Sequence, residues 1–322
     1  MNQPEQQRDH DDDLRPDLDG LRHKRLLLIT GKGGVGRTTV AAVLARMCAR
    51  SGKRVVLLEL GESEEDFSPL ARFFGRDRLT AELQQLGPNL KGGLLLARVG
   101  HGLFLEKVLR MPMLVRAALR SKALRRFLDA VPSFHEAGLF QHMLGYMQAK
   151  NAAGQHEHEV VIIDMPATGH TLALTKLPEI LLKLIPGGPI TTELRAGLSY
   201  VNDPAQSAAW VVTLPEVLPV SEALELIEGL QETATPIGGV VLNRFPADRF
   251  SPAERAALDP LLASKPVFGA LAYRRVAAAE HALERLQRST ELPLVLVREH
   301  SRRQSDLVEA ILDDLLRREA AP

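Results

Sequence analysis

The chain has 322 residues, which allows one large α/β domain or two small ones with a substantial core. Its 40 Lys and Arg residues balance 40 Asp and Glu residues, and only 4% of residues are aromatic, so nucleic-acid binding is not expected. The single cysteine, Cys48, excludes an intrachain disulfide or a cysteine zinc site. Because no apolar run approaches the roughly 18 residues of a membrane span and no secretory signal is visible, we expect a cytoplasmic protein.

The first 23 residues are polar and charged, so we expect residues 1–23 to be a disordered tail and residues 24–322 to be the folded domain. From Arg25 onward, short runs of Val, Ile and Leu recur between helical patterns. The predicted strands are Leu26–Thr30, Arg54–Leu60, Gly93–Val99, Val160–Asp164, Trp210–Leu214, Ile237–Asn243, Pro266–Leu271 and Leu294–Val297. Most are apolar on both faces, which is typical of parallel strands covered by helices. The sequence therefore predicts an α/β fold with a doubly wound, mostly parallel sheet.

Two long segments, residues 101–150 and 171–205, have helical patterns without a convincing strand. We expect them to form a helical layer inserted in the same domain, since no linker separates them from the sheet. Four of the seven methionines lie in the first segment, which is typical of surfaces that adapt to varied apolar partners. A groove for a hydrophobic client and an ordinary helical core both remain open. Basic residues between positions 107 and 126 favour solvated helix faces over a peripheral membrane or acidic-partner surface.

A glycine-rich loop follows the first predicted strand and precedes a helical pattern. The loop comprises Gly31, Lys32, Gly33, Gly34, Val35, Gly36, Arg37, Thr38 and Thr39. Glycines let successive N–H groups face one anion, and the helix N-terminus adds a positive field. Thr38 stands where a magnesium-binding hydroxyl is needed, and Thr39 is placed to bond an inner phosphate. The sequence therefore predicts a phosphate-binding loop of the P-loop type.

Two features leave the ligand of this loop open. The P-loop pattern has Lys where this chain has Arg37, a larger planar cation that still neutralises phosphate, so we expect binding with slowed hydrolysis. Gly31, Gly33 and Gly36 also satisfy the dinucleotide pattern G-x-G-x-x-G, with Glu59 near the end of the second strand. A second motif favours the nucleoside triphosphate: the buried run Val160–Asp164 ends in a carboxylate that can hold the water shell of magnesium opposite Thr38.

These motifs together resemble a known family. Gly31-Lys-Gly-Gly-Val-Gly is similar to the deviant Walker A motif of MinD/ParA-type P-loop ATPases. Asp164-Met-Pro-Ala-Thr-Gly-His-Thr171 resembles the switch II signature D-T-A-P-T-G-H-T of the arsenite-pump and tail-anchored-protein-targeting branch. Thr213-Leu-Pro-Glu216 resembles the P-E segment of that branch, and Asn243 matches its adenine-contacting asparagine. The resemblance covers residues 24–315.

The resemblance implies an ATP- and Mg²⁺-dependent homodimer, or a heterodimer with a paralogue, whose nucleotide cycle gates a groove for a hydrophobic client. Lys32 would reach the partner's phosphates, Arg37 and Asp164 would act at the hydrolytic centre, Thr38 and Asp164 would serve Mg²⁺, and Asn243 would bind adenine. With only Cys48, neither the clustered cysteines of the arsenite pump nor a Cys-x-x-Cys zinc clasp can form.

The chain departs from the family pattern at switch I, where the branch has a catalytic Asp in D-P-A-H. This chain reads Glu59-Leu-Gly-Glu62-Ser-Glu-Glu-Asp66 instead. Glu59 and Glu62 are candidates for orienting the attacking water, and a solvated acidic loop is the alternative for Glu62–Asp66. Together with Arg37, this departure predicts a slow ATPase, or else a hydrolysis-deficient pseudo-ATPase that regulates or scaffolds a paralogue.

Overall fold

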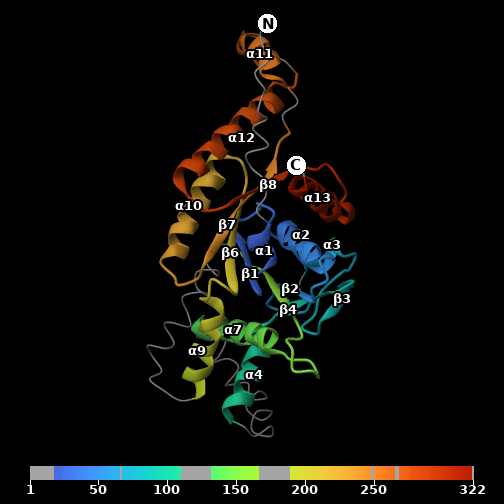
Figure 1. Ribbon diagram of the computed structural model, residues 1–322, viewed down its shortest axis with the longest axis vertical. Coiled ribbons are helices and arrows are strands. Elements are labelled where there is room, and N and C mark those ends of the chain that lie inside the picture. Colours follow the sequence, from blue (N-terminus) through green and yellow to red (C-terminus); the bar gives the residue numbers. More distant parts are fainter. Residues whose placement is uncertain are drawn as a thin grey trace.

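The protein is built on one eight-stranded sheet with the strand order β3-β4-β2-β5-β1-β6-β7-β8 (Figure 1). The computed structural model describes residues 18–65, 67–109, 132–166, 189–247, 250–264 and 268–320. The strands are β1 (Leu26–Gly31), β2 (Val55–Leu60), β3 (Gln84–Gly87), β4 (Leu90–Leu95), β5 (Val160–Asp164), β6 (Ser207–Thr213), β7 (Ile237–Phe245) and β8 (Leu294–Arg298). Neighbouring strands are parallel, except for the antiparallel pair of β3 and β4 at one edge.

Helices cover both faces of the sheet (Figure 1). They are α1 (Asp19–Arg22), α2 (Arg37–Arg50), α3 (Pro69–Phe73), α4 (Ala97–Leu109), α7 (Pro132–Gln148), α9 (Pro189–Val201), α10 (Val217–Gln231), α11 (Pro252–Ser264), α12 (Ala270–Ser289) and α13 (Gln304–Glu319). Leu27 and Ile29 of β1 pack into a core with α2 and α13, whereas Leu26 and Leu28 pack into a second core with α7, α10 and α12. Successive side chains of a strand point to opposite faces, so a strand buried on both faces needs an unbroken apolar run. The predicted doubly wound, mostly parallel sheet is confirmed.

Two predicted strands need correction, and one strand of the sheet was not predicted. The strand predicted at Gly93–Val99 is β4, which lies earlier, at Leu90–Leu95, because helix α4 already begins at Ala97. The strand predicted at Pro266–Leu271 is not found in its described part, since Phe268 and Gly269 form a turn and α12 starts at Ala270; residues 266 and 267 lie outside the described residues. Strand β3 was not expected, because its residues Gln-Gln-Leu-Gly form a short polar edge rather than an apolar run.

The described parts of the two long helical segments are helices. Helix α4 packs on α7 and α9, while α7 contacts β4 and α9 contacts β6, so these three helices lie together against the sheet at one end of the molecule (Figure 1). Residues 110–131 and 167–188, which include most of the basic series and much of both segments, lie outside the described residues. The role of this layer in binding a client stays a prediction.

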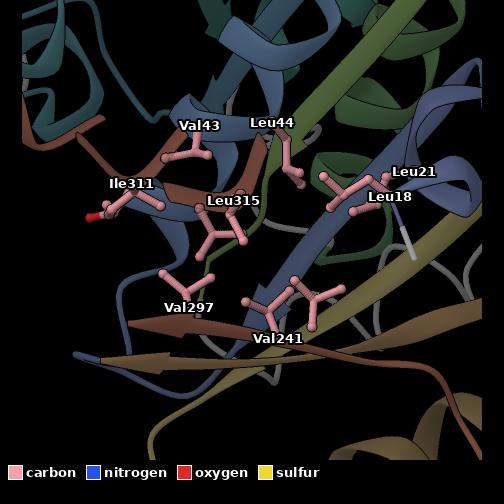
Figure 2. A pocket seen from close by; sticks show the side chains of 11 residues that line it. Leu18, Leu21, Val43, Leu44, Val241, Val297, Ile311 and Leu315 are labelled. Carbon is pink, nitrogen blue, oxygen red and sulfur yellow. The ribbon is translucent and has the colours of Figure 1, made fainter. Parts of the chain in front are cut away.

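The N-terminal boundary differs from the expected one. Residues 18–22 belong to the folded body, because α1 starts at Asp19 and the side chains of Leu18 and Leu21 are buried. Figure 2 shows these two leucines in an apolar pocket that is also lined by residues of α2, β7, β8 and α13. Arg22 adds a bidentate ion pair with Glu319 at the end of α13, with N···O distances of 2.6 and 2.7 Å. Two apolar side chains spaced three residues apart are enough to dock a single helical turn. The polar composition of the first 23 residues as a whole concealed this docking.

Among the described residues, none of the helices combines the length and apolar character that crossing a membrane requires.

Replacing Leu21 by Ala should lower the free energy of unfolding by about 2–5 kcal/mol, as expected for a leucine fully buried against α2 and α13. Chemical denaturation of the full chain measures this loss. Leu218→Ala, at a leucine that is 67% exposed, is the matched control and should change stability by less than about 0.5 kcal/mol. Equal effects of the two substitutions would contradict the docking of residues 18–22.

Candidate functional site at the phosphate loop

The glycine-rich loop connects β1 to α2, and two of its glycines are required by close contacts. A Cβ atom on Gly31 would lie 2.3 Å from the carbonyl oxygen of Val212 in the neighbouring strand β6. Gly36, the N-cap of α2, has φ 92°, and a Cβ atom there would lie 2.2 Å from Nδ2 of Asn243. These positions therefore accept only glycine, because the loop is pressed against the ends of β6 and β7.

The outer side of the loop is open and rich in donors. A Cβ atom on Gly33 or Gly34 would meet nothing within 4 Å. In the described part of the chain, the backbone N–H groups of residues 33–36 donate to no acceptor. They precede the N-terminus of α2, a helix of 14 residues without a side-chain cap. Free N–H groups at a helix N-terminus form a site for an anion such as phosphate.

Asp164 lies at the mouth of this loop. The sheet register pairs it with Ile29 of β1 on one side and Glu59 of β2 on the other. Its side chain is buried and accepts a hydrogen bond from the Thr38 hydroxyl, with the Arg37 guanidinium close enough to interact electrostatically. Burial raises the pKa of Asp164 to about 6, and the contacts with Thr38 and Arg37 oppose that rise. The hydroxyl and the carboxylate thus lie together, as the sequence predicted.

Arg37 takes part in the loop itself. Its Nη1 donates a hydrogen bond to the Gly31 carbonyl oxygen at 3.1 Å, which closes the loop across its base. Burial lowers the pKa of the guanidinium, while the carboxylate of Asp164 raises it. Arg37 therefore compensates the buried charge of Asp164 and binds the backbone, in addition to lying beside the predicted phosphate site.

Glu59 is the acid that lies beside the predicted metal site, whereas Glu62 points elsewhere. Glu59 is partly buried and accepts hydrogen bonds from the Ser68 hydroxyl and the Leu70 N–H at the start of α3. Burial, together with the nearby charge of Asp164, raises the pKa of Glu59 to about 7, and the hydrogen bonds from Ser68 and Leu70 oppose that rise. Glu62 is 78% exposed and lies 3.7 Å from His135 of α7. Sequence reasoning missed Ser68 as the partner of Glu59, although Ser-Pro is a typical start of a helix.

Lys32 and Asn243 both have partners within the chain. Lys32 forms an ion pair with Glu222 of α10 at 3.7 Å. The amide of Asn243 donates to the Val35 carbonyl at 2.8 Å, and its oxygen accepts from the N–H of Arg244 at 2.9 Å. Asn243 is 3% exposed, so in this structure it braces the phosphate loop. Its contact with adenine stays a prediction, and the pairing of Lys32 with Glu222 had no signal in the sequence.

The remaining predicted site residues are distributed around the same strand ends. Thr39 lines the same apolar pocket that holds the buried side chains of Leu18 and Leu21. Thr213, at the end of β6, is buried, and its hydroxyl has no hydrogen-bond partner among the described residues. In the switch II segment, Asp164, Met165 and Pro166 are described, and residues 167–171 lie outside the described residues.

The strand order, the loop between β1 and α2, and the Thr38–Asp164 pair define a P-loop nucleotide-binding fold. Comparison with known sequences identifies the family: the profile of the Anion-transporting ATPase family matches residues 24–186, half of the chain. The chain belongs to this ArsA/Get3 family of P-loop ATPases. The resemblance noted from the motifs is thereby confirmed, and a dinucleotide-binding enzyme is not supported.

Several curated relatives are similar over about 70% of the chain. ATPase BagA of Mycobacterium tuberculosis is 28% identical over 228 residues, which cover 68% of this chain and 65% of that protein. ATPase get3 of Botryotinia fuckeliana is 27% identical over 242 residues, covering 71% of this chain and 64% of that protein. The putative arsenical pump-driving ATPase 2 of Aquifex aeolicus is 24% identical over 274 residues, covering 72% and 85%. The chain thus spans slightly less than two thirds of the first two relatives.

The pKa of Glu59 predicts a pH-dependent effect on stability. Its folded-state value of about 7 exceeds the ordinary 4.5, so the folded protein holds this proton more tightly, and stability is lost as pH rises through 7. Glu59→Gln should therefore raise the free energy of unfolding at pH 8, by up to about 3 kcal/mol, and have little effect at pH 4. Thermal denaturation across this pH range, without Mg²⁺, measures the difference. Glu291→Gln, at an exposed glutamate, is the control; a variant less stable than wild type at pH 8 would contradict the prediction.

Proposed function

We propose that this protein binds ATP with Mg²⁺ at the loop of residues 31–39, hydrolyses it slowly, and uses the nucleotide to control a dimer that handles a hydrophobic client or partner protein. The observation that carries the proposal is the meeting of a buried carboxylate, Asp164, and a hydroxyl, Thr38, at the mouth of an open loop of unpaired N–H groups. Both groups are oxygen ligands of the kind Mg²⁺ prefers, and the N–H groups suit phosphate oxygens. The donor set therefore fits the metal–nucleotide pair that the family membership implies.

In this proposal each residue has a separate role. The N–H groups of residues 33–36 and the N-terminus of α2 hold the phosphates, and Thr38 and Asp164 hold the metal through oxygen atoms or its water shell. Bound Mg²⁺ supplies charge neutralisation of the phosphate oxygens. Glu59 is the described acid beside this site, at the position from which a carboxylate can orient water, and its hydrogen bonds to Ser68 and Leu70 fix its direction.

Slow hydrolysis is supported by the two departures from the family pattern. Arg37 donates to the Gly31 carbonyl and faces Asp164, so it must leave these partners, or share them, to stabilise charge on a transferring phosphoryl group. The segment after β2 has no D-P-A-H sequence. Phosphoryl transfer depends on positioned charge rather than on covalent chemistry, so misplaced positive charge and a missing switch I Asp both slow the reaction.

Dimer formation and client binding rest on the family and on two local features. Lys32 is paired with Glu222 only at 3.7 Å and both side chains are about one third exposed, so the lysine is available to exchange partners. An open surface cleft of about 410 Å³ lies between helices α4 and α7. It is lined by Leu103, Glu106, Gln141, Gly145, Gln148 and Ala149. A cleft in the helical layer supports a binding role for that layer. The arsenite-pump chemistry is not proposed, because one cysteine cannot form a metalloid site.

The alternative function is that of a hydrolysis-deficient pseudo-ATPase that binds nucleotide and regulates or scaffolds a paralogue. The observation that favours it is the engagement of Arg37 with its own loop. Under this alternative, Thr38, Asp164 and the loop still bind nucleotide, and a functional dimer needs the second protein.

Measurement of Mg²⁺-dependent ATP binding and turnover tests the main proposal. The wild type should bind ATP and turn over at well below about 1 per second, and Arg37→Lys should raise turnover at least about tenfold, because a slender point charge reaches the phosphates without the bond to Gly31. Asp164→Asn, which leaves shape unchanged and removes the charge, should abolish turnover in both backgrounds. Wild-type turnover at or above about 1 per second would contradict slow hydrolysis, and absence of ATP binding would contradict the function as a whole.

Sedimentation velocity with Mg²⁺ and a non-hydrolysable ATP analogue tests the dimer. Wild type should dimerise only with nucleotide, and Lys32→Ala should remain monomeric, since its ammonium group would no longer bind the partner's phosphates. Glu222→Gln is the matched control: it breaks the same ion pair but frees Lys32, so dimerisation should persist. Dimerisation of Lys32→Ala equal to wild type would contradict the role of Lys32, and a wild type that binds nucleotide but stays monomeric would support the paralogue alternative.

A further inference from the structure

Strand β7 carries a bulge close to the phosphate loop, and Arg244 lies in this bulge. The pairing of β7 with β8 advances from Leu242 to Phe245 in β7, while β8 advances by one residue less. Bulges are frequent beside functional sites, where they change the direction in which a side chain points. The carboxyl end of β7 therefore presents its side chains differently from a regular strand.

Arg244 has a backbone conformation that arginine rarely adopts. Its φ is 55°, in the left-handed region that is unfavourable for a residue with a Cβ atom. Its N–H donates to Oδ1 of Asn243 at 2.9 Å, and Nδ2 of the same amide donates to the Val35 carbonyl of the loop at 2.8 Å. A single side chain, that of Asn243, thus ties the strained residue to the phosphate loop and fixes the position of one relative to the other.

The guanidinium of Arg244 is free for a ligand, whereas the neighbouring amide is already engaged. The Arg244 side chain is exposed and forms no hydrogen bond, ion pair or ring contact with the residues that the structure describes. Asn243 is 3% exposed and uses both ends of its amide within the chain. A strained backbone that holds an unpaired cation beside a binding loop points to a functional role for that cation.

The predicted metal site indicates the direction in which a nucleoside would extend from the loop. Thr38 and Asp164 meet on the side of the loop where β5 lies, whereas β6 and β7 follow β1 on the other side. Mg²⁺ bound to a nucleoside triphosphate contacts its outer phosphates, so these belong on the β5 side. The nucleoside then extends over the carboxyl ends of β6 and β7, and Arg244 lies at the end of β7.

We infer that the guanidinium of Arg244 stacks on the purine base of a nucleotide whose phosphates lie on residues 31–39. The inference rests on the proposed nucleotide site and adds to it the contact for the base. A guanidinium is planar, and its positive charge is attracted to the face of an aromatic ring. Stacking of this kind contacts the face of the base and not its hydrogen-bonding edge, so Arg244 contributes affinity for adenine and guanine alike.

Titration calorimetry of the full chain with Mg²⁺ and ADP, GDP or tripolyphosphate tests the inference. Tripolyphosphate has no base, and the two diphosphates lack the γ-phosphate that the proposed dimer binds. Arg244→Gly removes the side chain at a φ that glycine adopts without strain. This variant should bind ADP and GDP at least about fivefold more weakly than wild type, while its affinity for tripolyphosphate should change by less than about twofold.

The matched control is Arg288→Gln, which removes a cation that is 80% exposed from the end of α12 that precedes β8, at the opposite edge of the sheet. It should bind all three ligands like wild type. Arg244→Asn, with a second residue type that tolerates the left-handed region, should repeat the loss seen with glycine. Thermal denaturation without ligand shows that each variant is folded.

The outcomes separate this inference from the proposed function. If Arg244→Gly binds ADP as tightly as wild type, the inference is overturned and the proposed nucleotide site stands. Equal losses for ADP and tripolyphosphate would make Arg244 a phosphate contact, which also overturns it. A wild type that binds none of the three ligands would contradict the proposed function itself, and the base contact with it.

Discussion

The burial of Asp164 at the end of a central strand is the constraint on which the nucleotide site depends. Its register partners are Ile29 and Glu59, and neither is a cation that could compensate the buried charge. Burial raises the pKa of Asp164, and the compensation comes from the two residues that begin α2, Arg37 and Thr38. A cation bound between Asp164 and phosphate would relieve the same charge. The site is therefore prepared for positive charge, and until a ligand supplies it Arg37 serves in its place.

The precision of this arrangement comes from the packing around α2 rather than from the loop alone. Helix α2 is buried along most of its length between the sheet, α3 and α13, and Leu18, just before α1, and Leu21 of α1 close the remaining apolar space (Figure 2). On the other side, Gly31 touches Val212, and Asn243 ties the Val35 carbonyl. Because the loop is fixed at both ends by backbone contacts, its free N–H groups keep their direction without a ligand, which lowers the entropy lost on binding.

The sequence predicted what depends on local pattern and failed where tertiary contacts decide. Apolar runs located the central strands, because a strand that is buried on both faces must be apolar at nearly every position. The glycine-rich loop and Asp164 could be located because a phosphate loop of this type requires particular residue types at fixed positions. The polar edge strand β3 and the docking of Leu18 and Leu21 were missed, because neither has an independent local signal. The apolar pattern of Pro266–Leu271 predicted a buried strand, but the side chains of Phe268 and Leu271 are exposed on the surface. The sequence assigned Asn243 to adenine, which stays a prediction, and gave no sign of its bond to the Val35 carbonyl.

Both basic side chains that the sequence assigned to phosphate already have partners within the chain, and this gives the loop its connection to the rest of the fold. Arg37 donates to the Gly31 carbonyl of its own loop, so breaking this hydrogen bond acts directly on the loop alone. Lys32 is bound to Glu222 of α10, and α10 packs on α12, where Arg285 also donates to the Val217 carbonyl at 3.2 Å. Under the proposed function, a phosphate that bound Lys32 would leave Glu222 of α10 without its cation. Because α10 packs on α12, these two helices are the part of the fold that the Lys32–Glu222 ion pair connects to the loop.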